Sequence, residues 1–436
     1  MADIRSLGFA LAGTFALRCA SYGAGIIIPV FLGLKSRHDD AVTVGIASLI
    51  AISFYAAELI GAPVFGALSD RYGRKPFMIL GPVFGGVAIQ LLGFTSVVPV
   101  LIVVRLLEGL STASSAPSTL GFLSARTGHS ERLRSRVMGF YQAATVVGLA
   151  SGAALGGQIY QYFKDWRAFT AVALIYVVAL LLFLPVRDTG APAGAADGHA
   201  LGARSHSPRA ILTRMLNPQI MRFAPAWLAA NAVIGAWFSV GPFLAAGRPN
   251  PSQFFMGGYE SNQIGIAFMV FGIVFTLGAI TWGFVMPRIG RQATLLVGVV
   301  GLAAATVMFW VINQVPRQEH SFATLVVLMG LLVVAVFVQS GFTPAALAYL
   351  AEIAEDHPED RGAVMGLYSV LLSIGQLLGG AIAGPFANRG GVNGLIVLTA
   401  LLTGVAAATV LQLGAAERRA RSARRVSQPA ESGPGA

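Results

Sequence analysis

Long apolar runs separated by short polar stretches dominate the chain from one end to the other. Twelve of these runs reach the ~20 residues that an α-helix needs to cross the hydrocarbon core of a bilayer. The predicted spans cover residues 7–33, 42–68, 77–96, 98–124, 135–162, 168–185, 219–245, 262–286, 292–313, 322–350, 361–387 and 392–414. The pattern therefore predicts an all-α membrane protein with twelve transmembrane helices.

The composition excludes a large soluble protein. Of the 436 residues, 55% are hydrophobic and 11% are charged, whereas an ordinary globular domain carries about 25% charged residues. So few charges cannot cover the surface of the two or three soluble cores that a chain of this length would form. The single cysteine, Cys19, and six scattered histidines form no metal constellation, and no phosphate-binding loop is present. We therefore expect no metal, no cofactor and no direct drive by ATP.

Basic residues are divided unequally between the two sides of the predicted bundle. The side that holds both termini carries 21 of the 30 Lys and Arg residues, and the opposite side carries seven. Because cytoplasmic loops carry the excess of basic residues, both termini are expected in the cytoplasm, in a multi-pass protein of the cell (inner) membrane. The net charge of +11 thus reflects topology, and no basic and aromatic run indicates binding to nucleic acid.

A polar break divides the twelve spans into two groups of six. Residues 186–216 are rich in Gly, Ala, Pro and Arg and have no apolar period, which is typical of a flexible linker. We expect an N-terminal six-helix bundle at 1–185, this linker on the cytoplasmic side, and a C-terminal six-helix bundle at 217–414. Residues 415–436 are polybasic and then low in complexity, so a disordered basic tail is expected there.

The two groups of six repeat each other in sequence. Gly148 and Gly152 in the fifth span recur as Gly375 and Gly379 in the eleventh, an offset of 227 positions. Residues of the loop after the second span recur after the eighth at an offset of 217. Parallel six-helix repeats are typical of transporters that rock one half against the other around a site at the midplane. Two pseudo-symmetric six-helix bundles are therefore predicted.

The loop after the second span is a candidate gate. It contains Gly66, Asp70, Arg71, Gly73, Arg74 and Lys75, and the acidic loop before the eleventh span contains Glu359 and Asp360. We expect Asp70 to meet the positive N-terminal end of the eleventh span and the three basic residues to face the two acidic ones, as a latch between the halves. The alternative is a charged turn that only fixes topology. Pro287 replaces the aspartate in the second half, so a weaker twin latch is expected there.

Four charged residues lie inside predicted spans, where a charge is costly and normally faces a partner or a cavity. They are Arg18, Glu58, Arg105 and Glu108. Glu58 precedes Asp70 by twelve residues, which places it ~18 Å from the membrane surface and close to the midplane. One interpretation is proton coupling. The other is a structural network in which Arg105 neutralises Glu108 at i and i+3 and Arg18 pairs with Glu58.

The second half offers no ionisable residue at that depth. Its candidates for lining a substrate cavity are amides and aromatic residues near the centres of the spans, namely Trp227, Asn231, Trp237, Gln339 and Phe342. Amides inside membranes also hold helices together, which is the structural alternative. A cavity with one charged wall and one aromatic, amide-bearing wall would suit an amphipathic small molecule.

Three motifs resemble those of a known family. The loop from Gly66 to Lys75 resembles the signature loop of the major facilitator superfamily. The fifth span resembles the antiporter motif of its twelve-helix drug/proton exporters, with Ala153 where that family has proline; its glycines are Gly139, Gly148, Gly152, Gly156 and Gly157. Arg105 and Glu108 match a third motif, in which the resemblance implicates the arginine in proton coupling and places glutamine at the position of Glu108. The resemblance implies the major facilitator fold and alternating access.

We therefore expect a secondary transporter, not an enzyme, that acts as a proton-coupled antiporter and exports a small amphipathic molecule, with Glu108 or Glu58 carrying the protons. One alternative is a lipid or organic-anion carrier of the same fold that uses Arg18 and Arg105 as anion contacts. Another is a transporter-like membrane receptor. The expected partners are a small-molecule substrate, protons and membrane lipids, and the expected assembly is a monomer.

The spacing of the glycines in the fifth span also predicts close packing on one helical face.

Overall fold

The computed structural model describes residues 4–94, 97–127, 130–187, 218–315, 321–355 and 361–427. These residues form helices and connecting turns, without a strand. Within these described ranges, twelve stretches are long and apolar enough to cross a membrane, as the hydropathy pattern predicted. The helices are α1 (Ile4–Ser36), α2 (Val44–Tyr72), α3 (Lys75–Leu92), α4 (Val98–Thr127), α5 (Glu131–Phe163), α6 (Trp166–Phe183), α8 (Pro218–Ala246), α9 (Ser261–Ile289), α10 (Arg291–Gln314), α11 (Phe322–Gln339), α12 (Phe342–Glu355), α13 (Arg361–Gly390) and α14 (Val392–Ser427).

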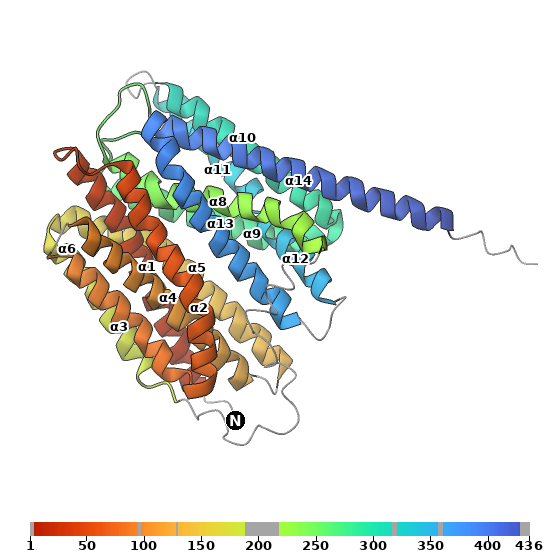
Figure 1. Ribbon diagram of the computed structural model, residues 1–436, viewed down its shortest axis with the longest axis horizontal. Coiled ribbons are helices and arrows are strands. Elements are labelled where there is room, and N and C mark those ends of the chain that lie inside the picture. Colours follow the sequence, from red (N-terminus) through yellow and green to blue (C-terminus); the bar gives the residue numbers. More distant parts are fainter. Residues whose placement is uncertain are drawn as a thin grey trace, which may run out of the picture.

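The helices form two bundles that lie side by side (Figure 1). Helices α1–α6, drawn from red to yellow, make the N-terminal bundle, and α8–α14, drawn from green to blue, make the C-terminal bundle. Within the first bundle α1 packs against α5, and within the second α8 packs against α13. Between the bundles, α5 packs against α9 and α2 packs against α13. The matching pairs confirm the predicted pseudo-symmetry.

Short polar side chains begin several of the helices. The side chains of Thr43, Ser130 and Ser321 accept a hydrogen bond from the backbone N–H three residues later, and that of Asp165 accepts one from the N–H two residues later. Such caps satisfy backbone donors that the first turn of a helix leaves free. The polar breaks between the apolar runs therefore set the helix starts.

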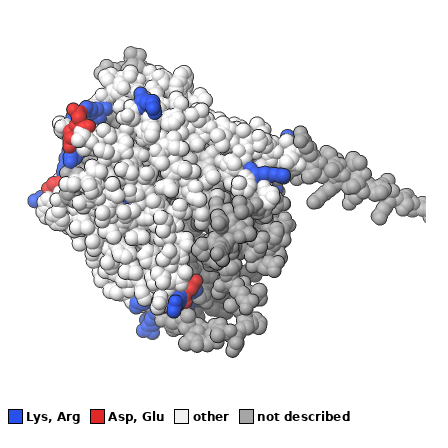
Figure 2. Space-filling view, in the orientation of Figure 1, with Lys and Arg blue, Asp and Glu red and all other residues white. Residues whose placement is uncertain are grey.

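Charged side chains gather at the two ends of the bundle, and a broad uncharged surface lies between them (Figure 2). We call the end that carries the Gly66–Lys75 loop and the start of α1 the motif end, and the other the opposite end. At the motif end, Lys75 donates to the Leu184 carbonyl, and the Arg187 N–H donates to the Ser6 hydroxyl. The uncharged surface between the ends matches the surroundings that lipid provides.

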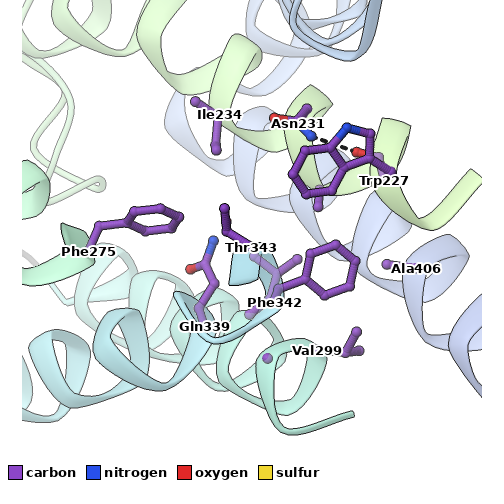
Figure 3. Close-up of a pocket in the computed structure, with 12 residues that line it drawn as sticks. Trp227, Asn231, Ile234, Phe275, Val299, Gln339, Phe342, Thr343 and Ala406 are labelled. Carbon is purple, nitrogen blue, oxygen red and sulfur yellow. Dashed lines mark hydrogen bonds between the residues drawn. The ribbon is translucent and has the colours of Figure 1, made fainter. Parts of the chain in front are cut away.

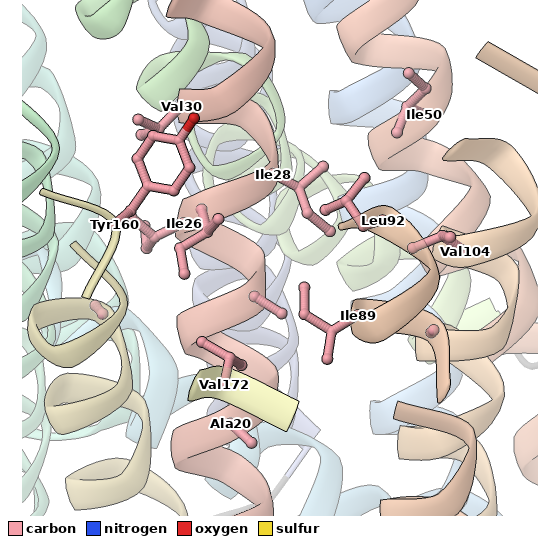
Figure 4. Packing of buried hydrophobic residues seen from close by; sticks show 14 of the residues in the cluster. Ala20, Ile26, Ile28, Val30, Ile50, Ile89, Leu92, Val104, Tyr160 and Val172 are labelled. Carbon is pink, nitrogen blue, oxygen red and sulfur yellow. The ribbon is translucent and has the colours of Figure 1, made fainter. Parts of the chain in front are cut away.

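The core of the N-terminal bundle is built around α1. Ile26 and Ile28 of α1 are 2% exposed, and Ile89 of α3 and Val172 of α6 are fully buried. Figure 4 shows these side chains directed from neighbouring helices into the same interior. Because α1 also packs against α8, it is apolar on several faces. The charged residue in the middle of α1, Arg18, therefore lies in the interior of the protein rather than on its lipid-facing surface.

The tenth span is interrupted. The sequence predicted one helix over 322–350, whereas the structure ends α11 at Gln339 and begins α12 at Phe342, with Ser340 and Gly341 in a turn. Pro344 has no N–H to donate to the Ser340 carbonyl, which weakens the helix at this point. Two half-helices thus meet near the midplane of the C-terminal bundle.

The last helix is longer than predicted. We expected a disordered tail from residue 415, but α14 continues to Ser427. The segment from Ala415 to Arg425 is rich in Ala and Arg, which have high helix propensities, so the helix continues beyond the apolar span. Residues 188–217, which contain most of the expected linker, and residues 428–436 lie outside the described part of the chain.

Candidate functional site

Glycines of α5 bring its backbone into contact with α1. A Cβ atom built at Gly152 would overlap the Cys19 carbonyl, and one at Gly156 would lie 2.7 Å from the Gly23 Cα. A Cβ at Gly148 would lie 2.8 Å from the Arg18 Cβ. Only glycine, which has no Cβ, permits the two helices to approach each other this closely. The predicted glycine face therefore packs within the N-terminal bundle.

The other two glycines of the motif behave differently. Gly157 faces the C-terminal bundle, where its Cβ would lie 3.0 Å from the Gly265 Cα of α9. The carbonyl of Ala153, which stands where the resembled family has proline, also lies against Gly265. Among the described residues, no atom lies within 4 Å of a Cβ built at Gly139. Gly157 and Ala153 of the motif thus contact α9 of the other half.

The same geometry recurs in the C-terminal bundle. Gly375 of α13 packs against α8, where its Cβ would lie 2.7 Å from the Asn231 Cβ, and Gly379 packs against the Ala232 carbonyl. Since Gly148 meets Arg18 in the same way that Gly375 meets Asn231, these last two residues occupy equivalent places in the two halves. An arginine in one half is thus replaced by an amide in the other.

Arg105 and Glu108 form a buried ion pair on α4. The Arg105 Nη1 donates to the Glu108 Oε2 at 2.6 Å, and the two residues are 8% and 1% exposed. The guanidinium also lies 4.9 Å from the centre of the Phe54 ring. The neutralisation expected from their i and i+3 spacing is present.

Arg18 and Glu58 lie near each other without forming an ion pair. Both are half-buried, and Glu58 has no carboxylate oxygen within 4.0 Å of a basic nitrogen in the described part of the chain. Arg18 lies beside Tyr22 and Tyr141 and within electrostatic range of Glu58. The direct Arg18–Glu58 pair that the structural network required is therefore not formed. Each residue keeps some accessible surface.

A small cavity in the C-terminal bundle lies beside the break between α11 and α12 (Figure 3). Its lining residues are Trp227, Ala230, Asn231, Ile234, Phe275, Gly298, Val299, Leu302, Gln339, Phe342, Thr343 and Ala406. Its volume of about 20 Å³ is enough for one water molecule. The Asn231 Nδ2 donates to the Trp227 carbonyl at 2.9 Å, and the rings of Trp227 and Phe342 are nearly parallel, 6.1 Å apart. Four of the five predicted cavity residues meet here.

Trp237 does not belong to this cavity. Its indole N–H donates to the Thr399 hydroxyl at 3.0 Å, and its ring stacks on Phe309 at 4.7 Å. Sequence reasoning did not single out Thr343, which lines the cavity next to the helix break. Pro344, one position later in the sequence, is the signal that could have drawn attention to it.

The candidate gate is bonded within its own half. Arg74 pairs with Asp70 at 3.1 Å and donates to the Gly121 carbonyl, and Arg71 lies over the Tyr72 ring at 5.4 Å. The Asp70 side chain is 59% exposed. Gly73 has a φ of 94°, which glycine adopts without strain. Glu359 and Asp360 lie outside the described residues, so the latch stays a prediction.

Polar contacts join the two halves at the opposite end. The Arg37 Nε donates to the Ala246 carbonyl at 2.8 Å, and Arg248 pairs with Asp40. Between the midplane and this end, the Ser48 hydroxyl donates to the Gly380 carbonyl at 2.6 Å. The two halves are therefore bonded to each other at this end.

Comparison with known sequences identifies the family. The profile described as Major Facilitator Superfamily matches residues 10–259 and 252–433. The chain belongs to the major facilitator superfamily. It is a multi-pass integral membrane protein and a transporter rather than an enzyme, as the signature loop implied.

Characterised relatives and solved structures cover most of this superfamily member. Multidrug resistance protein 1 of Bacillus subtilis (strain 168) is 26% identical over 373 residues, which is 84% of this chain and 86% of that protein. The class C tetracycline resistance protein of Escherichia coli is 24% identical over 370 residues, 82% of this chain and 84% of that protein. The crystal structure of the nucleoside transporter NupG superposes with a TM-score of 0.70 at 13% identity, covering 94% of this chain and 98% of that chain. This structural similarity shows the fold alone.

Proposed function

We propose that this transporter is a proton-coupled antiporter that exports a small amphipathic organic molecule. The observation that carries the proposal is the pair Arg18 and Glu58, half-buried and not ion-paired at the centre of the protein. A carboxyl group that cycles a proton must be reachable by water in at least one state of the cycle, and it must not be permanently neutralised. Glu58 meets both conditions, whereas Glu108 is enclosed and bonded to Arg105. We therefore assign the exchange of protons with solvent to Glu58.

The two halves supply different chemistry at equivalent places. Arg18 corresponds to Asn231 by helix packing, and Glu58 corresponds to Phe275 at the sequence offset of 217. The N-terminal half therefore offers charged groups where the C-terminal half offers aromatic rings and amides. An amphipathic molecule could place its apolar part against Trp227 and Phe342 and its polar part toward Arg18 and Glu58. The names of the multidrug and tetracycline resistance relatives agree with export of such compounds.

The orientation and division of the chain are part of the proposal. We place the motif end in the cytoplasm of a cell with an inner membrane, because the census of basic residues favours that side. The bundles would comprise residues 1–185 and 217–414, joined by a cytoplasmic linker at 186–216, and the protein would act as a monomer. The bonded opposite end would then be closed toward the outside.

Flux measurements test this function directly. The purified chain in proteoliposomes is expected to move at least one amphipathic compound of a test panel against its gradient when a pH gradient is imposed. Collapse of that gradient by a protonophore should abolish accumulation, and empty liposomes are the control. If no compound moves faster with a pH gradient than without one, the assignment to proton-coupled antiport is wrong.

A lipid or organic-anion carrier is the second candidate. Arg18 is accessible at the membrane centre, as an anion contact requires, but Arg105 is already bonded to Glu108. A triacylglyceride transporter of Mycobacterium tuberculosis (strain ATCC 25618 / H37Rv) is 27% identical over 315 residues, which is 61% of this chain and 59% of that protein. Flux of organic anions or lipid without a pH gradient, lost in Arg18→Gln, would favour this candidate.

The gate yields a separate prediction. Asp70→Asn is expected to shift the resting population toward a state open at the motif end by ~1 kcal/mol, the usual size of a charge effect at a helix terminus. Distances between spin labels in the loops after α2 and before α13 should lengthen. The chain suits such labelling because its one cysteine, Cys19, is buried. Arg288→Gln, in the twin loop that lacks the aspartate, is the control. If the distances are unchanged in Asp70→Asn, the loop does not act as a latch and only fixes the topology.

A further inference from the structure

A second cavity opens at the opposite end of the N-terminal bundle. It has a volume of about 260 Å³ and lies where the ends of α1, α3 and α5 meet the start of α6. The rings of Phe31, Tyr160 and Phe169 pack together in its wall, with the Phe169 centre 5.7 Å from that of Phe31 and 6.0 Å from that of Tyr160. The exposed residues Lys164 and Trp166 also line it. The cavity therefore combines an aromatic wall with a basic residue at the surface.

Lys164 has a backbone conformation that residues with a Cβ rarely adopt. It follows the last residue of α5 with a φ of 55°, and it is the only non-glycine residue with a positive φ in the described part of the chain. Glycine usually takes this left-handed conformation after a helix. The equivalent residue of the other half, 227 positions later, is Gly391 with a φ of 59°. Both halves require this turn, and only the N-terminal half places a lysine in it, which indicates a role for the lysine side chain.

The corresponding place in the C-terminal bundle is filled by protein. A Cβ built at Gly391 would lie 2.5 Å from the Met256 sulfur and 3.1 Å from the Gln253 Oε1. Both residues belong to the segment 247–260, which joins α8 and α9. In the N-terminal half, where the shorter segment 37–43 joins α1 and α2, the cavity lies at the equivalent place beside Lys164. The space that protein fills in one half is therefore open to a ligand in the other.

Lys164 supplies an unpaired positive charge to the cavity. No carboxylate of the described residues lies within 4.0 Å of its ammonium group. The neighbouring Asp165 is engaged, because its carboxylate accepts from the Arg167 N–H at 2.9 Å and lies 3.8 Å from the Arg167 Nε. The Tyr160 hydroxyl makes no hydrogen bond to a described residue, and Figure 4 shows it pointing along α1 in the direction of Val30. The cavity thus offers one cation and one hydroxyl donor.

Exposed aromatic residues place the cavity at the level of the membrane surface. Phe94 and Trp166, which line it, are 74% and 51% exposed, and Tyr162 on the last turn of α5 is 82% exposed. Tyr and Trp are enriched where the bilayer meets water, and lysine side chains extend to the same level. Phospholipid headgroups lie at this depth, so they are the molecules that meet the cavity at high local concentration.

We propose that this cavity binds the headgroup of an anionic phospholipid from the leaflet at the opposite end. The single negative charge of a lipid such as phosphatidylglycerol matches the single unpaired cation, Lys164, and the Tyr160 hydroxyl donates to a phosphate oxygen. The rings of Phe31 and Phe169 contact the glycerol and the first methylenes of the acyl chains. A zwitterionic headgroup would bring a second cation beside Lys164, so it binds less tightly. The site does not depend on which substrate is transported.

Thermal melting with defined lipids tests the site. The chain purified in dodecylmaltoside is expected to melt about 3 °C higher with phosphatidylglycerol than with phosphatidylcholine of the same acyl chains, because a ligand of the folded state stabilises it. In native mass spectrometry, phosphatidylglycerol should stay bound at an energy that releases phosphatidylcholine. sn-Glycerol 3-phosphate, which has the phosphate without acyl chains, should give no shift at the same concentration. Equal shifts with the two lipids, or an equal shift with glycerol phosphate, would overturn the assignment to an anionic lipid.

Lys164→Gly separates lipid binding from folding. Glycine adopts this turn without strain, as Gly391 does, so the melting temperature without lipid should equal or exceed that of the wild type. The shift caused by phosphatidylglycerol should be lost, and Lys164→Arg, which keeps the charge, should retain it. Arg389→Gln is the matched control, since it removes an exposed positive charge at the same end, on α13.

Three outcomes would overturn the lipid site. The first is a full phosphatidylglycerol shift in Lys164→Gly. The second is a lower melting temperature of Lys164→Gly without lipid, which would give the lysine a structural role. The third is an equal loss of the shift in Arg389→Gln, which would show a response to overall charge rather than to this cavity.

Discussion

Glu58→Gln is expected to abolish accumulation driven by a pH gradient, with a loss of about 100-fold in the initial rate. Glutamine keeps the shape and polarity of the side chain, but its amide cannot bind and release a proton in the physiological range. Exchange of labelled for unlabelled substrate across proteoliposomes at equal pH requires no proton cycle, so it should remain measurable. Comparing the two assays on the same preparation separates loss of coupling from loss of folding.

The conservative variant Glu58→Asp is the control, because it keeps a titratable carboxyl group and should recover part of the driven uptake. Glu108→Gln is a weaker test. Glu108 neutralises a guanidinium that is 8% exposed, and removing one partner of a buried ion pair costs ~3–5 kcal/mol. Loss of activity there could reflect loss of fold. Full uptake in Glu58→Gln with a pH gradient as the only drive would show that Glu58 does not carry the proton.

Gly152→Val is expected to prevent most of the chain from reaching its folded state. A Cβ at this position would overlap the Cys19 carbonyl on α1. Because the obstruction is backbone rather than the end of a flexible side chain, α1 and α5 would have to separate along their whole contact. Overpacking costs ~1–3 kcal/mol in ordinary cores, and the cost should exceed that range here. The amount of monodisperse protein after detergent extraction, together with its melting temperature, measures the effect.

Gly139→Val is the matched control. It makes the same substitution on the same helix and in the same motif, but no atom of the part of the chain that the structure describes lies within 4 Å of the added Cβ. Its yield and melting temperature should stay near those of the wild type. Gly379→Val should reproduce the Gly152 defect, because its Cβ would overlap the Ala232 carbonyl on α8. A well-folded Gly152→Val would contradict the close α1–α5 contact.

The architecture was predictable from the sequence because it depends on properties that are local along the chain. The length and hydropathy of each apolar run determine whether it can span a bilayer, and the spacing of Gly148 and Gly152 recurs unchanged at Gly375 and Gly379. The bond between Arg105 and Glu108 was also predictable, since residues at i and i+3 are neighbours on any helix. Local properties did not determine the helix break at Ser340. Pro344, which follows the break, corresponds to Pro117 in the first half, yet α4 runs through Pro117 without a break.

Contacts between distant helices were decided only by the tertiary structure. Arg18 and Asn231 are equivalent by packing but 213 positions apart, an offset that neither sequence repeat shows, because loops of different length shift the register between halves. Trp237 is a large aromatic residue like those that line the cavity, yet the rotation of α8 directs its side chain to Thr399. Tyr176 on α6 packs against α3 only because Gly85 has no Cβ, which would overlap the tyrosine ring. Hydropathy specifies which segments enter the membrane, whereas side-chain volume and helix rotation specify which residues meet inside it.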